Sequence, residues 1–202
     1  MCLLCNMNIS TLEYIQEAIP NITIDMRYAG KYNFTGDVVY KFGEKAALQK
    51  EALDMLKIAQ IFLKNLYPEL SLVVWDAARP EYAQYYLWEW VKDTPNHIYI
   101  ADPAEGSLHT YGMAVDVTLC DSAGELLDMG TPFDHFGRQS HPEYEPILLQ
   151  DNSLSHHQLA NRLLLRYIMV HAGFIPIPHE WWHFNASTLE QAKSRYSKIV
   201  RV

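Results

Sequence analysis

Two short segments of this 202-residue chain concentrate residues that bind metals and move protons. The first contains His109 and Asp116, and the second contains Glu180 and His183. A catalytic zinc ion needs three protein ligands and one open position for water, and His109, Asp116 and His183 provide such a set. Zinc lowers the pKa of its bound water from about 15.7 towards 7, so this set predicts hydrolytic chemistry at neutral pH.

Hydrolysis also needs a group that takes a proton from the water and passes it to the leaving amine. Glu180, three residues before His183, is the natural candidate. Residues three apart in a regular strand face opposite sides of the sheet. Glu180 must therefore lie on a turn or bulge in order to share a site with His183. His179 is the closest alternative metal ligand.

Each of these pairs is common by chance, and an aspartate on the polar face of a strand is often only solvated. The combination is more specific, because Asp116 interrupts an apolar stretch and Gly112 and Ala114 leave room beside it. A buried ionic group needs a partner or a metal. A Ser-His-Asp triad of Ser107, His109 and Asp116 is disfavoured, because residues two apart on a loop rarely reach the required geometry.

The strands that would position these residues follow from the hydrophobic pattern. Apolar and polar residues alternate over 22–26 and over 113–119, and a β-branched and aromatic run predicts a strand over 70–75. Residues 174–184 contain two prolines, which exclude a helix and favour a loop that enters an aromatic edge strand. The second chemical segment lies at the end of this stretch.

The helices follow from three-to-four-residue apolar spacing and from capping signals. Pro80 is suited to open a helix, and Ser155 with Gln158 and Ser187 with Glu190 have capping-box spacing. Long connections between the strands favour an α+β fold, in which a small antiparallel sheet carries the zinc site and helices pack on one side. We expect helices at about 43–66, 81–90, 159–170 and directly after Ser187.

Length and composition predict one domain over residues 1–202. The net charge of -8 excludes a phosphate-backbone partner, and no apolar run reaches the roughly 18 residues of a membrane span. Three cysteines favour a reducing compartment, hence the cytoplasm. Residues 1–8 are expected to be disordered or a residual export leader, which would place the protein in the periplasm instead. The Cys2-x-x-Cys5 spacing is interpreted as part of this terminus, and the oligomeric state stays open.

The motif Ser-x-His-x-x-Gly-x-Ala-x-Asp over residues 107–116, followed by Glu-Trp-Trp-His over 180–183, resembles the D-alanyl-D-alanine dipeptidases of the vancomycin-resistance type. That family shares a zinc fold with lysostaphin-like enzymes, D-alanyl-D-alanine carboxypeptidases and hedgehog signalling domains. One departure is Ala78, where an aromatic residue is expected, and this change should alter packing more than chemistry. The resemblance covers most of the chain, with further matching pieces at 27–29, 33–36, 75–80, 129–134 and 140–141, of which the first two favour the dipeptidases over the carboxypeptidases.

The resemblance implies hydrolysis of the free dipeptide D-alanyl-D-alanine to two D-alanines. One zinc ion per chain would be held by His109, Asp116 and His183. Glu180 would act as the general base and then as the general acid. Arg79 would stabilise the oxyanion of the tetrahedral intermediate, a role that suits a permanently charged donor.

The same resemblance implies how a small dipeptide is held. Ser107 would receive the substrate carboxylate. Tyr28 and Asp134 would hold its free ammonium group. The alternative interpretations are a loop serine, a packed aromatic residue and a turn aspartate.

Two other functions stay open at this point. One is a zinc D,D- or L,D-carboxypeptidase or endopeptidase that acts on peptidoglycan peptides. The other is a non-catalytic binding module stabilised by zinc, which Glu180 and Arg79 disfavour because a structural site needs neither a base nor an oxyanion donor. For Arg79 itself, the alternative is a surface ion pair with Asp76 or Glu81.

Overall fold

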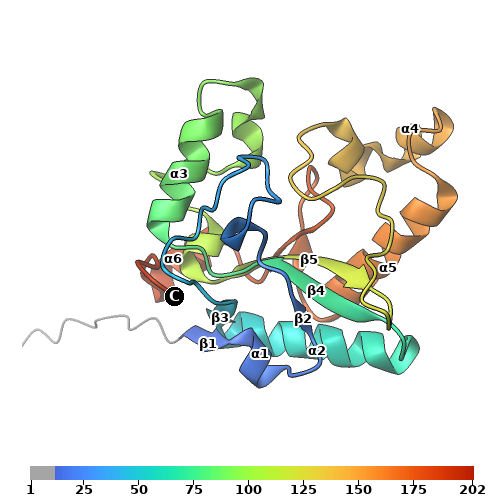
Figure 1. Cartoon of the computed structure of the whole chain (residues 1–202), viewed down its shortest axis with the longest axis horizontal. Helices are drawn as coiled ribbons and strands as arrows, with labels where there is room; N and C mark the ends of the chain where they lie inside the picture. The colour runs from blue at the N-terminus through green and yellow to red at the C-terminus, as the bar shows by residue number, and fades with distance from the viewer. Residues whose placement is uncertain (1–11) are drawn as a thin grey trace, which may run out of the picture.

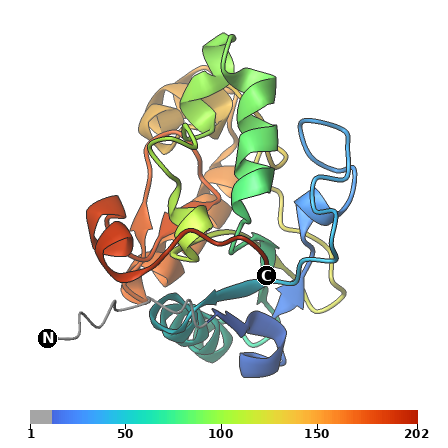
Figure 2. The same ribbon diagram turned by 90° about the vertical axis from the view of Figure 1, so that its left-hand side faces the viewer.

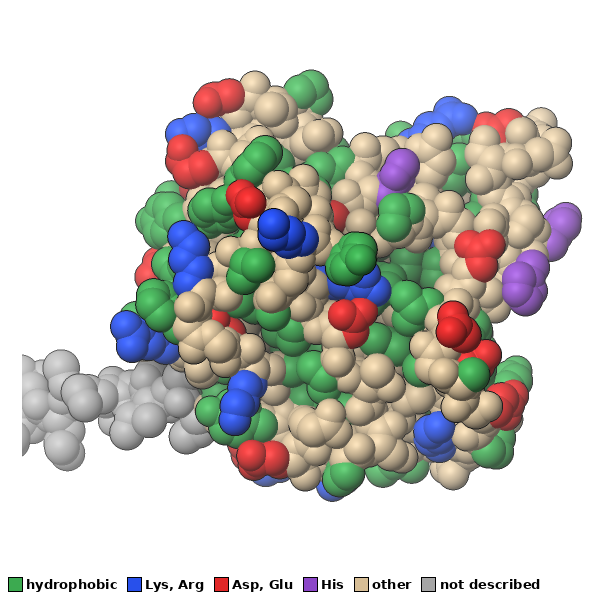
Figure 3. All heavy atoms as spheres, in the orientation of Figure 1, with side chains coloured by type: hydrophobic (Ala, Val, Ile, Leu, Met, Phe, Trp, Pro, Cys, Tyr) green, Lys and Arg blue, Asp and Glu red, His purple; other side chains and the backbone are tan. Residues whose placement is uncertain are grey.

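A computed structural model of the chain describes residues 12–202. The expectations for residues 1–8 and for the Cys2-x-x-Cys5 spacing lie outside these described residues. Between residues 12 and 202, no helix combines the length and apolar character needed to cross a membrane. On the face that Figure 3 shows, acidic and basic side chains are interspersed rather than gathered by sign.

The main sheet has five strands in the order β2-β4-β5-β7-β6. Neighbouring strands are antiparallel except at one edge, where β2 runs parallel to β4. The predicted α+β fold with a small, mainly antiparallel sheet is therefore confirmed. The strands are β2 (Thr23–Ile24), β4 (Ser71–Asp76), β5 (Ala114–Cys120), β6 (Ile175–Pro176) and β7 (His183–Asn185).

The two central strands, β4 and β5, are buried along their whole length. Both faces of the sheet are therefore covered at its centre. The helices α2 (Lys50–Leu66) and α5 (His156–His171) contact each other, and they pack against β4 and β5 respectively. The helix α3 (Glu81–Val91), which follows Pro80 as predicted, rises on the side opposite α2 (Figures 1 and 2).

Helix α2 begins later than predicted but ends at the predicted residue, Leu66. The strand β3 (Ala47–Gln49) precedes it and pairs with β1 (Leu12–Tyr14) in a second, two-stranded sheet. This pairing holds the chain extended up to Gln49, so the helix cannot start near Gly43. Its buried positions include Ala52, Leu56, Ala59 and Leu63, whereas Leu66, the last residue of the predicted helix, is 47% exposed.

Two helix starts test the capping signals. Ser155 and Gln158 make the predicted reciprocal capping box at the start of α5. The terminal helix α6 (Leu189–Arg195) is capped by Thr188 with Gln191, one residue later than the predicted Ser187. The Thr188 hydroxyl accepts the bond from the Gln191 N–H, which leaves the neighbouring serine outside the helix.

Strand β7 is not an edge strand, because β6 pairs along its outer side. Pro176 lies in β6, at the edge of the sheet, where a missing N–H is tolerated. The connections between strands carry the remaining short elements. These are α1 (Ile15–Ala18), η1 (Arg27–Ala29), η2 (Pro95–Tyr99), η3 (Leu108–Tyr111), η4 (Arg138–Ser140), η5 (Pro142–Tyr144) and α4 (Glu145–Gln150).

Candidate active site

Three neighbouring strands place polar residues side by side at one end of the sheet. Asp76 on β4 lies opposite Asp116 on β5, and Asp116 lies opposite His183 on β7. A bulge between Val74 and Asp76 shifts the register of β4 so that Asp76 falls in this row. Side chains directly opposite each other on antiparallel strands have Cβ atoms about 4.5–5.5 Å apart, so they share one site.

His109 reaches the same site from the short helix η3. Ser107 is the N-cap of this helix, and its hydroxyl accepts a hydrogen bond from the backbone N–H of His109. Gly112 ends the turn with a φ of +68°, and a Cβ atom there would approach Leu12 to 2.8 Å. Glycine is therefore needed for the turn that returns the chain into β5.

His109, Asp116 and His183 bring their ligand atoms within 4.8 Å of one another. The nitrogen His109 Nε2 lies 3.1 Å from His183 Nδ1 and 3.4 Å from Asp116 Oδ1, and His183 Nδ1 lies 3.0 Å from the same oxygen. Three ligand atoms bound tetrahedrally at about 2.0–2.2 Å from one ion are separated by about 3.3–3.6 Å. The triangle therefore has the size of a candidate metal-binding group.

The outer ring nitrogens of both histidines have acceptors. His109 Nδ1 lies 2.7 Å from the carbonyl oxygen of Ala77, and His183 Nε2 lies 2.7 Å from Asn185 Oδ1. When each outer nitrogen donates its proton, both inner nitrogens turn lone pairs toward the Asp116 carboxylate. Two lone pairs and a carboxylate at this separation repel one another unless a cation lies between them, so the donor set fits a metal ion.

The Asp116 carboxyl is buried, and its ionisation follows from its neighbours. Burial alone would raise its pKa, but His109 and His183 hold that pKa below its ordinary value. The Asp116 carboxyl is therefore ionised at neutral pH, the form that could bind a metal ion.

Glu180 lies in the irregular segment that precedes β7, not in the strand itself. The backbone N–H of Trp181 donates to the carbonyl oxygen of Ser140, which holds this bend. The bend brings Glu180 Oε2 within 3.9 Å of His183 Nδ1, although the two residues are three apart. Burial raises the pKa of the Glu180 carboxyl to about 8 against the opposing effect of His183, and Asp116 and Asp134 raise it further.

Arg79 is buried and forms an ion pair with Asp76, but this pair lies inside the protein and not on its surface. Its Nε and Nη2 donate to Asp76 Oδ2, and its Nη1 donates to Gln84 Oε1. These bonds use three of the five guanidinium N–H groups. Nη2 also lies 3.9 Å from Asp116 Oδ2, so the guanidinium faces the metal-binding group.

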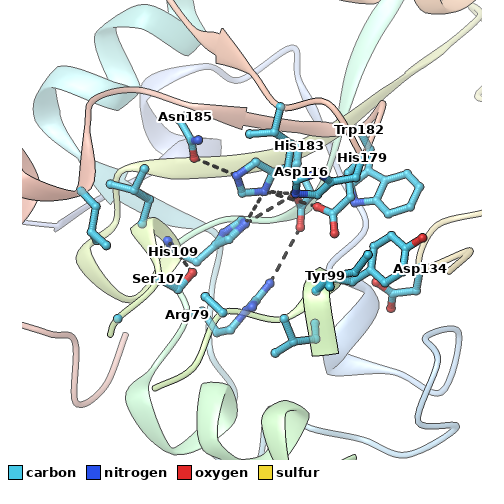
Figure 4. A pocket seen from close by; sticks show the side chains of 18 of the residues that line it. Arg79, Tyr99, Ser107, His109, Asp116, Asp134, His179, Trp182, His183 and Asn185 are labelled. Atoms are coloured by element: carbon cyan, nitrogen blue, oxygen red, sulfur yellow. Dashed lines mark hydrogen bonds and ion pairs between the residues drawn. The ribbon is translucent and has the colours of Figure 1, made fainter. Parts of the chain in front are cut away.

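All eight predicted site residues line one cavity of about 240 Å³, below the range of about 300–1,000 Å³ typical of sites for drug-sized ligands. In Figure 4, Ser107 and Asp134 lie on opposite sides of the metal-binding group. The Tyr28 hydroxyl donates to Asp134 Oδ1 at 3.1 Å, and the Phe34 N–H donates to Oδ2. Burial raises the pKa of Asp134 to about 8.

The sequence-based interpretation missed the residues that orient the site. Asn185 follows His183 by two positions on the same strand, a spacing that could have identified it as a neighbour on one face. Gln84 carried no such signal, because its role depends on how α3 packs. His179, the rival ligand, lines the cavity but lies outside the triangle of ligand atoms, and Ser107 bonds the backbone of His109 and not its ring.

Comparison with known proteins agrees with this geometry. The peptidase family M15 model described as D-ala-D-ala dipeptidase matches residues 9–200. A protein of Escherichia coli named D-alanyl-D-alanine dipeptidase is 38% identical over 190 residues, which cover 91% of this chain and 88% of the relative. A protein of Enterococcus faecium with the same name is 28% identical over 192 residues, which cover 85% of this chain and 89% of the relative. This peptidase belongs to the D-ala-D-ala dipeptidase family of M15 peptidases.

Proposed function

We propose that the protein is a zinc-dependent dipeptidase that hydrolyses D-alanyl-D-alanine to two molecules of D-alanine. The observation that carries this proposal is the placement of Ser107 and Asp134 on opposite sides of the metal-binding group in one small cavity. A free dipeptide has one charged group at each end, only a few ångströms apart. The names of the relatives from Escherichia coli and Enterococcus faecium support the same substrate.

His109, Asp116 and His183 would hold the zinc ion, one per chain. When bound there, zinc supplies a Lewis acid that acidifies water and polarises the scissile carbonyl. Asn185 and the carbonyl group of Ala77 accept hydrogen bonds from the outer ring nitrogens of His183 and His109. These bonds fix the tautomer in which the inner nitrogen of each ring carries the lone pair that would bind zinc.

Glu180 is the proposed general base and acid. Its carboxylate takes a proton from the attacking water as the oxygen bonds to the carbonyl carbon, and it then gives that proton to the amine as the C–N bond breaks. Burial raises the pKa of Glu180 above its ordinary value and toward neutral pH, where a proton relay works best.

Arg79 is the proposed stabiliser of the oxyanion that develops during attack. Its position is fixed by the ion pair with Asp76 and by the bond to Gln84, so two N–H groups remain for the substrate. A preorganised donor of this kind needs no rearrangement as charge develops.

The two ends of the cavity would recognise the two ends of the dipeptide. The Ser107 hydroxyl would donate to the substrate carboxylate. Asp134 would take the ammonium group, supported by Tyr28, and would lose its own proton on binding because an adjacent cation lowers the pKa of a carboxyl.

A panel of peptides assayed with and without a chelator tests this function. We expect D-alanyl-D-alanine to be cleaved, with activity lost to the chelator and restored by zinc. N-acetyl-D-alanyl-D-alanine should be cleaved at least about a hundredfold more slowly, because it leaves Asp134 without a cation. Equal rates on free and N-acetylated substrates would identify a carboxypeptidase instead. Turnover that resists complete removal of metal would refute the zinc mechanism.

A further inference from the structure

Tyr99 joins two parts of the protein above the cavity. It is the last residue of η2, and its ring stacks on Phe136 with centroids 4.7 Å apart and planes inclined by 8°. Its hydroxyl lies 2.7 Å from His141 Nε2. The segment after α3 and the segment before α4 rise on the same side of the sheet in Figure 1, and Figure 3 shows a notch between them. Tyr99 spans the space between these two segments.

The two residues that contact Tyr99, Phe136 and His141, have further contacts of their own. His141 is buried, and its other ring nitrogen lies 3.4 Å from Glu143 Oε1. Phe136 also contacts Phe34, with ring centroids 4.8 Å apart. Phe34, Phe136 and Tyr99 thus form a continuous row of rings, named here the aromatic cover.

The aromatic cover lies at the amino end of the proposed substrate site. The backbone N–H of Phe34 donates to Asp134 Oδ2 at 3.2 Å, which ties one end of the cover to the carboxylate that would bind the ammonium group. Tyr99, at the other end, lines the same cavity as Asp134, and Figure 4 shows them on the same side of the metal-binding group. Tyr99 is the ring of the aromatic cover that lines the cavity, and Phe136 stacks on it, so a group that extends the substrate past its ammonium would meet Tyr99.

We propose that Tyr99, held by Phe136 and His141, sets the upper limit of substrate length at the amino end of the site. This inference rests on the proposed dipeptidase function. Asp134 would select for the charge of the ammonium, whereas the aromatic cover would select against an additional residue whatever its charge. Admission of a longer peptide requires the ring stacking and the hydrogen bond of Tyr99 to break. Together these contribute a discrimination of roughly tenfold to a hundredfold.

The test compares D-alanyl-D-alanine with glycyl-D-alanyl-D-alanine, which adds the smallest residue at the amino end and keeps a free ammonium. The measured quantity is the ratio of kcat/KM for the tripeptide to that for the dipeptide, with release of D-alanine as the readout. We expect Tyr99→Ala to raise this ratio by roughly tenfold or more, and Tyr99→Phe, which keeps the ring and removes the hydrogen bond, to raise it less. Tyr85→Ala, a change at an exposed position on α3, should leave the ratio unchanged.

The outcomes separate the two proposals. If the unmodified protein cleaves the dipeptide but neither Tyr99 variant raises the ratio, the aromatic cover does not set substrate length and this proposal alone is overturned. If the unmodified protein does not cleave D-alanyl-D-alanine, the proposed function fails and the length limit fails with it. A melting temperature for each variant shows that the protein is folded, and Tyr99→Phe supplies the answer if Tyr99→Ala does not fold.

Discussion

Asp116 and His183 occupy directly opposite positions on the antiparallel strands β5 and β7, with Asp116 Oδ1 3.0 Å from His183 Nδ1. Two of the three proposed metal ligands are therefore set by strand register. A slip of one residue would turn His183 to the other face of the sheet. The third proposed ligand, His109, lies in a turn, and its own carbonyl oxygen accepts a hydrogen bond from the backbone N–H of Arg79. One turn therefore positions both a proposed metal ligand and the proposed oxyanion donor.

The first prediction concerns zinc binding and Asn185, which orients the proposed ligand His183. The purified protein should bind about one zinc ion per chain, and His183→Ala should bind far less. Asn185→Ala should weaken zinc binding by roughly tenfold to a hundredfold, because it removes the acceptor that fixes the His183 tautomer. Competition with a chromophoric chelator measures both affinities. Asn65→Ala, at an exposed position, is the matched control, and equal affinities in the two asparagine variants would contradict the prediction.

The second prediction concerns Glu180. Glu180→Gln keeps the shape of the side chain and removes the base, so kcat should fall by roughly a hundredfold or more. The zinc content should stay near one per chain, because Glu180 lies outside the triangle of ligand atoms. Exposed Glu190→Gln serves as the control. Near-normal turnover in Glu180→Gln would require another base, and His179 would be the first to test.

The third prediction concerns the fork geometry of Arg79. Arg79→Lys keeps the charge, but a lysine cannot bond Asp76 through two nitrogens and Gln84 through a third. We expect kcat to fall by roughly a hundredfold to a thousandfold, the usual cost of removing an oxyanion donor. Steady-state kinetics on D-alanyl-D-alanine measure the loss. A change confined to KM would show that Arg79 binds the ground state instead of the transition state.

The fourth prediction concerns pH and stability in the metal-free protein. Asp134 and Glu180 both have folded-state pKa values of about 8, well above their ordinary values. A carboxyl with a raised pKa stabilises the fold when protonated, and this contribution is lost as pH rises toward the folded pKa. The free energy of unfolding should therefore fall between about pH 5 and about pH 8.5, and Asp134→Asn should reduce that fall. Urea titrations at both pH values test this.

The matched control for the pH experiment is Asp93→Asn, at an exposed position after α3. It should retain the full pH dependence of the unmodified protein. Asp134→Asn should retain part of it, because Glu180 still titrates. An identical dependence in Asp134→Asn and in the control would show that Asp134 is not protonated in the folded metal-free protein.

Much of this site was predictable because its chemistry resides in compact motifs. The spacing from His109 to Asp116 and from Glu180 to His183 predicted the candidate ligands and base, and the family resemblance supplied the other candidate site residues. The hydrophobic pattern placed Asp116 on a strand. The need for a bend at Glu180 was also deduced from strand periodicity, and the structure contains such a bend. Local sequence patterns can predict a contact when the two residues that form it lie close together in the sequence.

Long-range contacts were not predictable from these patterns. Helix α2 begins at Lys50 because β3 pairs with a strand more than thirty residues earlier, which no local spacing reveals. The bond from Tyr99 to His141 joins two segments that lie far apart in the sequence. Ala78, the departure from the family pattern, packs with Ala47 and Ile199, again a contact between remote parts of the chain.

The last prediction concerns selection of a free amino terminus by Asp134. In the proposed complex, the substrate ammonium pairs with this carboxylate, and Tyr28 and the Phe34 N–H complete its hydrogen bonds. Asp134→Ala should lower kcat/KM for D-alanyl-D-alanine by roughly a hundredfold, because the buried cation loses its partner. The same change should affect N-acetyl-D-alanyl-D-alanine much less, since that substrate has no cation to lose. The ratio of kcat/KM for the two substrates therefore measures the charge selection directly, with Asp93→Ala as control. If Asp134→Ala slows both substrates equally, Asp134 supports the fold of the site without reading the ammonium group.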